Sequence, residues 1–592
     1  MYRPDLDALG GSLLLTALVA MLPLLTLFVL LGVMRMTAWK AALVALAISL
    51  AVAVFVYSMP AGQALLAGTQ GAAFGFFPIL WIVINAIWVY NMTVVTGHSD
   101  VLRRSFAKVS DDQRIQAVIV AFCFGGLLEA LAGFGTPVAI TSVMLIGLGF
   151  RPIKAAVVAL VANTAPVAFG ALAVPITTLA TVTSLPEQEL SSIVGRQTPL
   201  LALFVPIALV FIIDRWKGVR QTLPATLTCG ITFAIAQFLC SNYVSPQLTD
   251  IVASLAAAAS VVLLLRVWRP AAPYVETPDL DTAQAETVAT ATAAPVGTRT
   301  AAAVAAGAST TGTSATTGGG NGSDHPTGQG TGTAADFAER DRNTHDPVSE
   351  VLRAYAPYLI IIVVFSLAQI PFLRDLLGAT TRSFQWPGLD LQSASGKPST
   401  LPTFKLNWLA GGGTLLIIAG LLTIPVLRIS PAKALKAYTG TYVQLKLAII
   451  TVMAVLGLAY VMNSSGQTAT LGLWMAGAGA AFALLSPILG WLGVAVTGSD
   501  TSSNALFGAL QVSAANQVGL SPSLMAASNT SGGVLGKMIS PQNLAIAAAA
   551  VGMSGKEGDI FRKVIGWSLG FLFFMMILVY LQSTPVLSWM LP

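Results

Sequence analysis

The chain has 592 residues, of which 55% are hydrophobic and only 9% are charged, and its mean hydropathy is +0.77. A soluble domain of this size does not need so apolar a composition, so we predict an integral, multi-pass membrane protein. The formal net charge of +6 comes from bases that stand singly at the ends of apolar runs. That placement is typical of orientation signals and excludes a nucleic-acid-binding protein.

Apolar runs long enough to span a membrane recur along the chain, and helices are predicted for them because strands open to lipid would leave backbone groups unpaired. The first run, 10–34, has no small-residue cleavage site after it and is interpreted as an anchor rather than a removable signal peptide. Between Arg114 and Arg151 there is room for two short spans, arranged as either a tight or a re-entrant hairpin. The other spans are predicted to end near 57 and to cover 71–96, 153–181, 197–213, 221–241, 249–267, 354–373, 406–427, 438–462, 471–495, 541–553 and 564–582.

The composition changes between residues 270 and 350, where the chain is rich in Ala, Thr and Gly and has no apolar periodicity. Such a segment cannot bury enough surface to fold. We therefore predict a disordered cytoplasmic linker at 270–350, with His325 and His345 solvated in it, between membrane halves at 1–269 and 351–592. The polar segment 374–405 is expected to face outward.

Residues 125–170 combine a carboxylate with helix-breaking residues inside otherwise membrane-spanning sequence. Glu129 lies in an apolar run, the run 133–137 (Gly-Phe-Gly-Thr-Pro) follows it, and Asn163-Thr164 interrupts the next apolar run. A charged side chain at the bilayer centre costs several kcal/mol, and non-helical backbone is tolerated there only inside protein or beside a wet cavity. The segment is therefore interpreted as a solute site.

The second half of the chain repeats this pattern. A constant shift takes Asn163-Thr164 to Asn529-Thr530, and a shift shorter by one residue takes Gly133 and Thr136 to Gly498 and Thr501. Repeats whose discontinuous helices meet near the midplane are common in secondary transporters. We predict an all-α polytopic membrane protein with about 12–14 transmembrane helices in two repeats, with discontinuous or re-entrant helices.

Of the acidic residues outside the linker, only Glu129 and Asp500 lie where an unpaired carboxylate would be costly. Each could cap a broken helix or pair with Lys537 or another base. The functional alternative is a proton or cation carrier, because burial favours the neutral form of a carboxyl. Hydroxyls around Asp500 are expected to donate hydrogen bonds and keep it ionised, which leaves Glu129 as the predicted proton carrier; these hydroxyls belong to Ser499, Thr501, Ser502 and Ser503.

The two Asn-Thr pairs and Lys537 also have two readings each. Asn and Thr are ordinary helix caps, whereas a half-helix N-terminus at membrane depth would bind a carboxylate. The recurrence of the pair in both halves favours the binding site. Lys537 could be an anchor that reaches the membrane surface, or a fixed positive charge beside an anionic solute.

Four long motifs resemble the bacterial lactate permease family, which includes lactate and glycolate permeases: CFGGLLEALAGFGTPVAIT, VANTAPVAFGALAVPI, LGWLGVAVTGSDTSSNALFGALQ and GKMISPQNLAIAAAAVG. The resemblance covers nearly the whole chain except the linker. It implies an inner-membrane transporter that couples 2-hydroxymonocarboxylate uptake to protons. It also implies a relation to sodium-coupled symporters with paired Ser-Asn-Thr motifs. Ser528-Asn529-Thr530 matches that motif and Ala162-Asn163-Thr164 departs from it, which argues against a sodium site on the first half.

The sequence therefore predicts a proton-coupled importer of lactate and glycolate in the bacterial inner membrane, with sodium coupling or an anion channel as alternatives. A membrane enzyme is not expected, because the sequence has no metal cluster, nucleophile–base pair or phosphate-binding loop. No cofactor is predicted, and the cysteines at 123, 229 and 240 lie within apolar segments at spacings that suit core packing rather than a metal site or disulfides. The predicted substrate-binding residues are Gly133, Gly135, Thr136, Asn163, Thr164, Ser499, Thr501, Ser528, Asn529, Thr530 and Lys537, with Glu129 and Asp500 for proton coupling.

Overall fold

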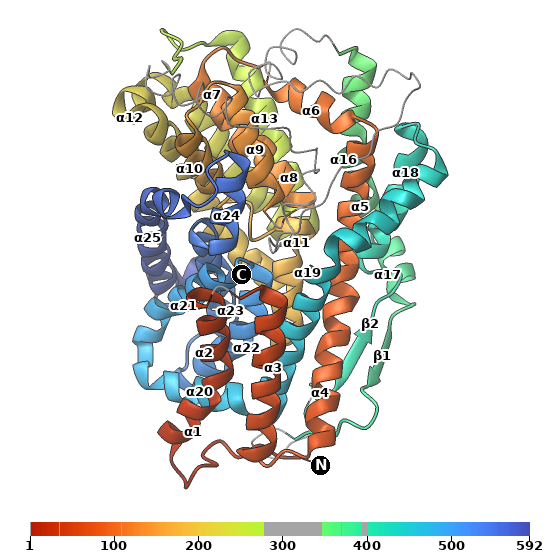
Figure 1. The fold of residues 1–592 in the computed structure, drawn as a ribbon, viewed down its shortest axis with the longest axis vertical. Coiled ribbons are helices and arrows are strands. Elements are labelled where there is room, and N and C mark those ends of the chain that lie inside the picture. Colours follow the sequence, from red (N-terminus) through yellow and green to blue (C-terminus); the bar gives the residue numbers. More distant parts are fainter. Residues whose placement is uncertain are drawn as a thin grey trace, which may run out of the picture.

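The computed structural model describes residues 2–34, 36–107, 109–131, 133, 135–276, 346–368, 370–392, 399 and 401–592. Most of the predicted linker, including His325 and His345, lies outside this part of the chain. Within it, ten helices are long and apolar enough to cross a membrane, and four shorter apolar helices accompany them. The predicted all-α polytopic fold with discontinuous helices is confirmed, and Figure 1 shows its helices running mostly along the long axis of the molecule.

All named secondary-structure elements in the described part of the first half are helices, with π and 3-10 segments (η) continuing several α-helices. Its elements are α1 (Leu13–Ala20), α2 (Leu22–Phe28), η1 (Val29–Val33), α3 (Ala38–Phe55), α4 (Ala61–Phe74), η2 (Gly75–Leu80), α5 (Trp81–Val95), α6 (His98–Ala107), α7 (Gln113–Ala117), η3 (Val118–Phe124), α8 (Gly125–Leu131), α9 (Thr136–Gly147), α10 (Pro152–Ala162), α11 (Gly170–Thr183), α12 (Glu187–Tyr243), η4 (Pro246–Leu248) and α13 (Thr249–Val267).

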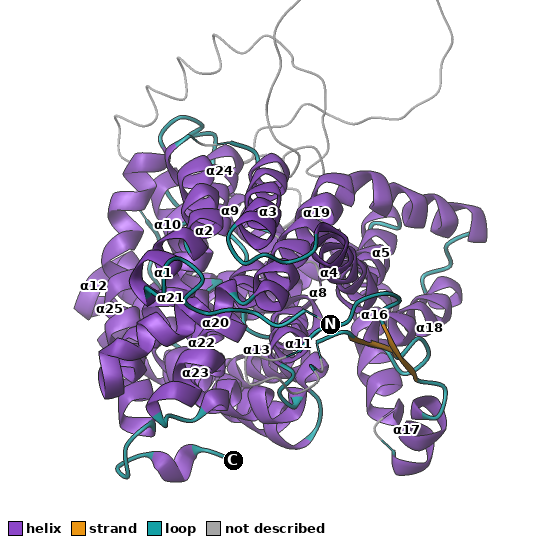
Figure 2. Ribbon diagram, turned by 90° about the horizontal axis from the view of Figure 1, so that it is seen from below, coloured by secondary structure: helices purple, strands orange, loops and turns teal. Residues whose placement is uncertain are grey.

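The second half adds a two-stranded antiparallel sheet in the polar segment at 374–405, with Phe384 paired to Phe404. Figure 2 shows this sheet at one edge of the molecule beside α16, α17 and α18. The elements are α16 (Val348–Ala368), α17 (Pro371–Gly378), β1 (Arg382–Gln385), β2 (Thr403–Leu406), α18 (Gly412–Val426), α19 (Pro431–Ser465), α20 (Gln467–Met475), η6 (Ala476–Ala481), α21 (Phe482–Thr497), α22 (Asp500–Val518), α23 (Pro522–Gly536), η7 (Lys537–Ile539), α24 (Pro541–Ala550), α25 (Glu557–Gln582) and η8 (Ser588–Met590).

Helix α12 is in effect two antiparallel helices. The chain reverses at Asp214 and Arg215, whose φ values are −137° and +50°. The Ser191 hydroxyl donates to the Ser241 carbonyl at 2.9 Å, although fifty residues separate them in sequence. The two arms therefore lie side by side, and they match the spans predicted at 197–213 and 221–241.

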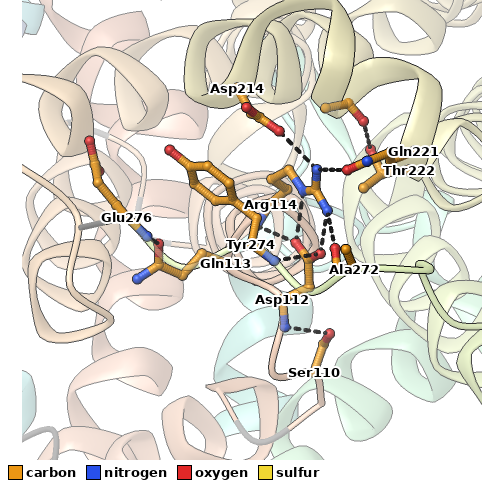
Figure 3. A network of polar contacts seen from close by, with 11 residues as sticks. Ser110, Asp112, Gln113, Arg114, Asp214, Gln221, Thr222, Ala272, Tyr274 and Glu276 are labelled. Atoms are coloured by element: carbon orange, nitrogen blue, oxygen red, sulfur yellow. Dashed lines mark hydrogen bonds and ion pairs between the residues drawn. The ribbon is translucent and has the colours of Figure 1, made fainter.

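A buried polar cluster holds this reversal in place (Figure 3). The Arg114 guanidinium is 1% exposed and pairs with Asp112 at 2.7 Å and with Asp214 at 2.8 Å. It also donates to the Ala272 carbonyl at 2.9 Å. A buried guanidinium is stable only when its donors are satisfied, so this cluster ties the start of α7 to the α12 reversal.

The first residues of the predicted linker, 270–276, pack against the membrane half instead of being solvated. Glu276 is 6% exposed, and its carboxylate accepts a hydrogen bond from Lys154 at 2.6 Å. The Glu276 amide donates to the Gln113 side-chain oxygen at 2.6 Å. Composition did not reveal this, because single polar side chains with buried partners determine it.

Deleting about 282–332 from the linker is expected to leave uptake near the wild-type level, because this segment has no apolar pattern with which to pack a core. Uptake per inserted protein is the measurement. As a control, a deletion that extends back to residue 272 should lower thermal stability, because it removes the partners of Arg114 and Lys154. Loss of transport by the short deletion at normal membrane abundance would contradict the prediction.

The segment between Arg114 and Arg151 forms a hairpin, whose first arm, Gln113–Leu131, is long and apolar enough to cross a membrane. Its two ends lie on the same face, since Gln113 donates to the Leu148 carbonyl at 2.7 Å. Helix α9 has 12 residues and is about 18 Å long, well short of the roughly 30 Å hydrocarbon core. Helices α21 and α22 form the corresponding hairpin of the second half, and Figure 1 shows the two hairpins in opposite halves of the molecule.

Helices α21 and α23 approach each other closely along a row of glycines. A Cβ atom added at Gly532 would lie 2.1 Å from the Pro487 carbonyl oxygen, and one at Gly536 would lie 2.2 Å from that of Trp491. Small residues at a helix interface permit such close backbone contact in a membrane, where the hydrophobic effect does not drive helices together. This contact fixes α23, which leads directly to the predicted site.

Candidate functional site

A buried ion pair joins the two halves of the chain. The Lys537 ammonium on η7 lies 2.6 Å from Glu129 Oε1 on α8, and Asn163 Nδ2 donates to Glu129 Oε2 at 3.0 Å. Glu129 is 3% and Lys537 is 7% exposed. The structure thus brings together three predicted residues, in the paired arrangement that the sequence left open.

The backbone around Glu129 leaves room for this pair. A Cβ atom at Gly170 would lie 2.7 Å from Glu129 Oε1, so a larger residue there would displace this carboxylate. The three residues that follow it, Ala171 to Ala173, have φ values of 45°, 56° and 60°. Left-handed backbone costs non-glycine residues about 1–2 kcal/mol each. Such outliers cluster at functional sites, and nothing in Ala-Leu-Ala predicts this one.

Asp500 is the second buried acid, 3% exposed, at the first position of α22. Neither carboxylate oxygen has a hydrogen-bond partner within the described residues, and Lys537 acts on it electrostatically. The hydroxyls expected to bind it do not: Ser499 caps the Ser502 amide, and Ser503 donates to the Gly490 carbonyl at 3.1 Å. That expectation was wrong, because the first hydroxyls of a helix satisfy its own or neighbouring backbone groups.

The tips of both hairpins meet the N-terminus of α24. A Cβ atom at Gly135 would lie 3.2 Å from Asn543 Oδ1, and one at Gly498 would lie 2.7 Å from Gln542 Oε1. Gly135 and Gly498 have φ values of +84° and +74°, which favour glycine. Thr136 and Thr501 occupy the first turns of α9 and α22. Three helix N-termini, with their partly unsatisfied N–H groups, therefore converge beside the ion pair.

The Asn-Thr pairs do not form half-helix N-termini as predicted. Asn163 is the C-cap of α10, and Thr164 donates back to the Leu160 carbonyl at 3.5 Å. Ser528, Asn529 and Thr530 lie inside the continuous helix α23. The second helix break comes later, at Ser540-Pro541, because proline cannot continue the helix.

The three residues within α23 are bound to neighbouring helices. Asn529 accepts from Gln511 at 2.8 Å and donates to Asn504 Oδ1 at 2.8 Å, and Thr530 donates to the same Asn504 oxygen at 3.0 Å. Ser528 contacts Ser486. These bonds explain why Asn is stable inside this helix. Asn163 differs, since its Oδ1 is buried without a partner among the described residues.

Sequence reasoning missed one buried acid near the site. Asp250 on α13 is fully buried, accepts from Gln237 at 3.0 Å and interacts electrostatically with Glu129. Its position near the end of a predicted span made it look like a loop residue. Only the burial of the α12–α13 turn against the rest of the chain reveals it.

The cluster consists of one base and two acids in a mostly apolar interior, and it suits the binding of a small ion better than catalysis. Within the described ranges, no group of three or more His, Cys, Asp or Glu side chains could hold a metal ion. Broken helices that surround a buried charged cluster, in a multi-pass helical fold, define a membrane transport protein.

Comparison with known proteins identifies the family. The family model described as L-lactate permease matches residues 16–308 and 330–586. The L-lactate permease of Bacillus subtilis is 38% identical over 99% of this chain and 98% of its own length. Glycolate permease GlcA of Escherichia coli is 39% identical over 98% of this chain and 97% of its own length. The chain belongs to the L-lactate permease family, and the predicted membership is confirmed.

Among solved structures, the YdaH transporter of Alcanivorax borkumensis aligns with 87% of this chain and 86% of its own, at 13% identity and a TM-score of 0.38. A likeness at this level does not establish a shared fold. The membrane-transport class rests instead on the family, whose members are named as permeases and not as enzymes.

Proposed function

We propose that this protein imports lactate and related 2-hydroxymonocarboxylates such as glycolate by proton symport across the bacterial inner membrane. The names of the similar permeases support the substrate class. The observation that carries the proposal is the buried Glu129–Lys537 pair, at 2.6 Å. Because Lys537 is already paired with the Glu129 carboxylate, it can exchange that partner for the carboxylate of a substrate.

In the proposed cycle, Lys537 pairs with Glu129 when no substrate is bound. The carboxylate of an incoming substrate then pairs with Lys537 and displaces Glu129. Glu129 accepts a proton, because a buried carboxyl without a basic partner favours its neutral form. One anion and one proton enter together, so the net charge of the cluster stays the same. The substrate-loaded protein can then change between its outward-open and inward-open states without moving extra charge through the low-dielectric interior.

The substrate's 2-hydroxyl group would bind the free oxygens at the site. Asp500 has two buried carboxylate oxygens and Asn163 has one amide oxygen without a hydrogen-bond donor among the described residues. A buried acceptor without a donor costs about 1–3 kcal/mol. A ligand hydroxyl relieves that cost, which supports 2-hydroxy acids over simple carboxylic acids.

A sodium-coupled carboxylate transporter is the second candidate, because the unpartnered Asp500 oxygens are also suitable ligands for a cation. Uptake of labelled lactate into proteoliposomes separates the candidates. A pH step in sodium-free buffer should drive accumulation by a proton symporter and not by a sodium symporter. Accumulation against the lactate gradient also excludes an anion channel, and competing acids should rank 2-hydroxy acids first.

The two asparagines should differ in their effects. Asn163→Ala removes the amide oxygen proposed to bind the substrate's 2-hydroxyl group, so it should weaken apparent lactate affinity by about 1–3 kcal/mol, with little change in thermal stability. Asn529→Ala leaves Gln511 and Asn504 without partners, so it should lower the melting temperature more than the affinity. KM and Tm of the two variants are the measurements. Equal losses of affinity at unchanged stability would instead support two equivalent carboxylate half-sites.

A further inference from the structure

An apolar crevice of about 390 Å³ lies between α12 and α25. Figures 1 and 2 both place these two helices side by side at one edge of the molecule. Phe204 is 47% and Trp216 is 66% exposed, so the crevice opens to the surroundings and not to the substrate site. Its aromatic lining consists of Phe204, Phe211, Trp216, Trp567, Phe571 and Phe574.

The α12 wall of the crevice is about as long as one membrane leaflet is thick. Its α12 side runs from Leu201 to Phe211, ten residues or about 15 Å at the helical rise. Half of a hydrocarbon core is likewise about 15 Å. Aromatic contacts join the two walls at both ends: Phe211 meets Trp567 with ring centroids 5.9 Å apart, and Phe204 meets Phe574 at 5.9 Å.

The mouth of the crevice is basic. Trp216 lies directly between Arg215 and Lys217, and Lys563 precedes Trp567 by one helical turn; all three bases are exposed. Within the described residues no ion pair holds Lys217 or Lys563. The acids of the neighbouring α25 start are engaged elsewhere: Asp559 faces Arg562 at 3.7 Å, and Glu557 accepts from the Gly555 amide at 2.9 Å.

We propose that this crevice binds one anionic phospholipid of the leaflet on the basic face, which the positive-inside rule places in the cytoplasm. One acyl chain lies along the aromatic lining, and the headgroup phosphate lies among Arg215, Lys217 and Lys563. Tryptophans at the mouth suit the headgroup level of a bilayer. Bases between membrane helices on this side are the recognised chemistry for anionic headgroups.

Lipid-specific quenching of tryptophan fluorescence tests the proposal. The full chain is reconstituted in phosphatidylcholine vesicles with a small fraction of either phosphatidylglycerol or phosphatidylcholine that carries bromine on its acyl chains. Brominated phosphatidylglycerol should quench more at equal mole fraction. The excess should disappear in W216F/W567F, which removes the two reporters beside the crevice.

Headgroup recognition is tested with Lys217→Gln and Lys563→Gln, singly and together. Each substitution should raise the phosphatidylglycerol fraction needed for half of the excess quenching by roughly 5-fold. The double substitution K433Q/K436Q, in the exposed first turns of α19, is the matched control and should change nothing. Equal quenching by both brominated lipids, or an excess that persists in W216F/W567F or in K217Q/K563Q, would show ordinary boundary lipid and overturn the proposal.

Discussion

Glu129→Gln is expected to abolish lactate accumulation driven by a pH gradient while lactate/lactate exchange continues. With one proton per anion, a step of one pH unit should concentrate lactate about 10-fold in the wild type, and this ratio should fall to one in the variant. Glutamine resembles the protonated side chain, so the substrate can still take Lys537, but no proton is released or bound. Counterflow and pH-driven uptake in the same proteoliposomes measure the two activities.

The Glu129→Gln substitution should also lower the stability of the protein, so two further variants are needed to separate lost stability from lost proton coupling. Removing Glu129 leaves a buried ammonium unpaired, which costs about 3–5 kcal/mol. Glu129→Gln/Lys537→Gln removes both charges, so it should recover stability but bind no anion and lose exchange as well. Glu187→Gln is the matched control: that carboxylate accepts hydrogen bonds from Thr177 and Gln247, lies outside the Glu129–Lys537 cluster, and should be replaceable with accumulation retained.

The outcome that contradicts the assignment is equally definite. If Glu129→Gln still concentrates lactate in response to a pH step, the proton travels on Asp500, on Asp250 or with the substrate itself. Asp500→Asn would then be the next variant, because Asp500 is buried beside Lys537 and neither of its carboxylate oxygens has a hydrogen-bond partner among the described residues.

The sequence predicted those features that depend on local composition. Apolar runs gave the helices, and Gly133, Gly135 and Gly498 correctly marked turns because glycine adopts left-handed backbone at no steric cost. Glu129 and Asp500 were singled out because hydrocarbon penalises a carboxylate wherever it lies. These inferences need no knowledge of which helices are neighbours.

What could not be predicted depends on partners far apart in sequence. Glu129 and Lys537 are 408 residues apart, so their pairing could only be one of several alternatives. Asn529 was predicted to bind the substrate at a half-helix N-terminus, because the sequence does not show that its partners, Asn504 and Gln511, lie on the neighbouring helix α22. The packing of residues 270–276 could not be predicted for the same reason, since the partners Gln113 and Lys154 precede this segment by more than a hundred residues.

Gly532→Ala is expected to cause a large loss of folded protein. The new Cβ atom would lie 2.1 Å from the Pro487 carbonyl oxygen, and backbone cannot move aside as a flexible side chain can. Helices α21 and α23 would have to separate, at a cost of about 3 kcal/mol or more. Because α23 leads directly into Lys537, the ion pair would be displaced too, so the protein that does fold should also transport poorly.

Thermal unfolding of the purified protein and its yield from the membrane measure this effect. Gly570→Ala is the matched control: it lies within helix α25, and an added Cβ atom would meet nothing within 4 Å. There, alanine should be neutral or stabilising by up to about 1 kcal/mol, because glycine weakens helix interiors. A Gly532→Ala protein as stable as Gly570→Ala would mean that α21 and α23 are not in close backbone contact, and that Lys537 is positioned by η7 and α24 instead.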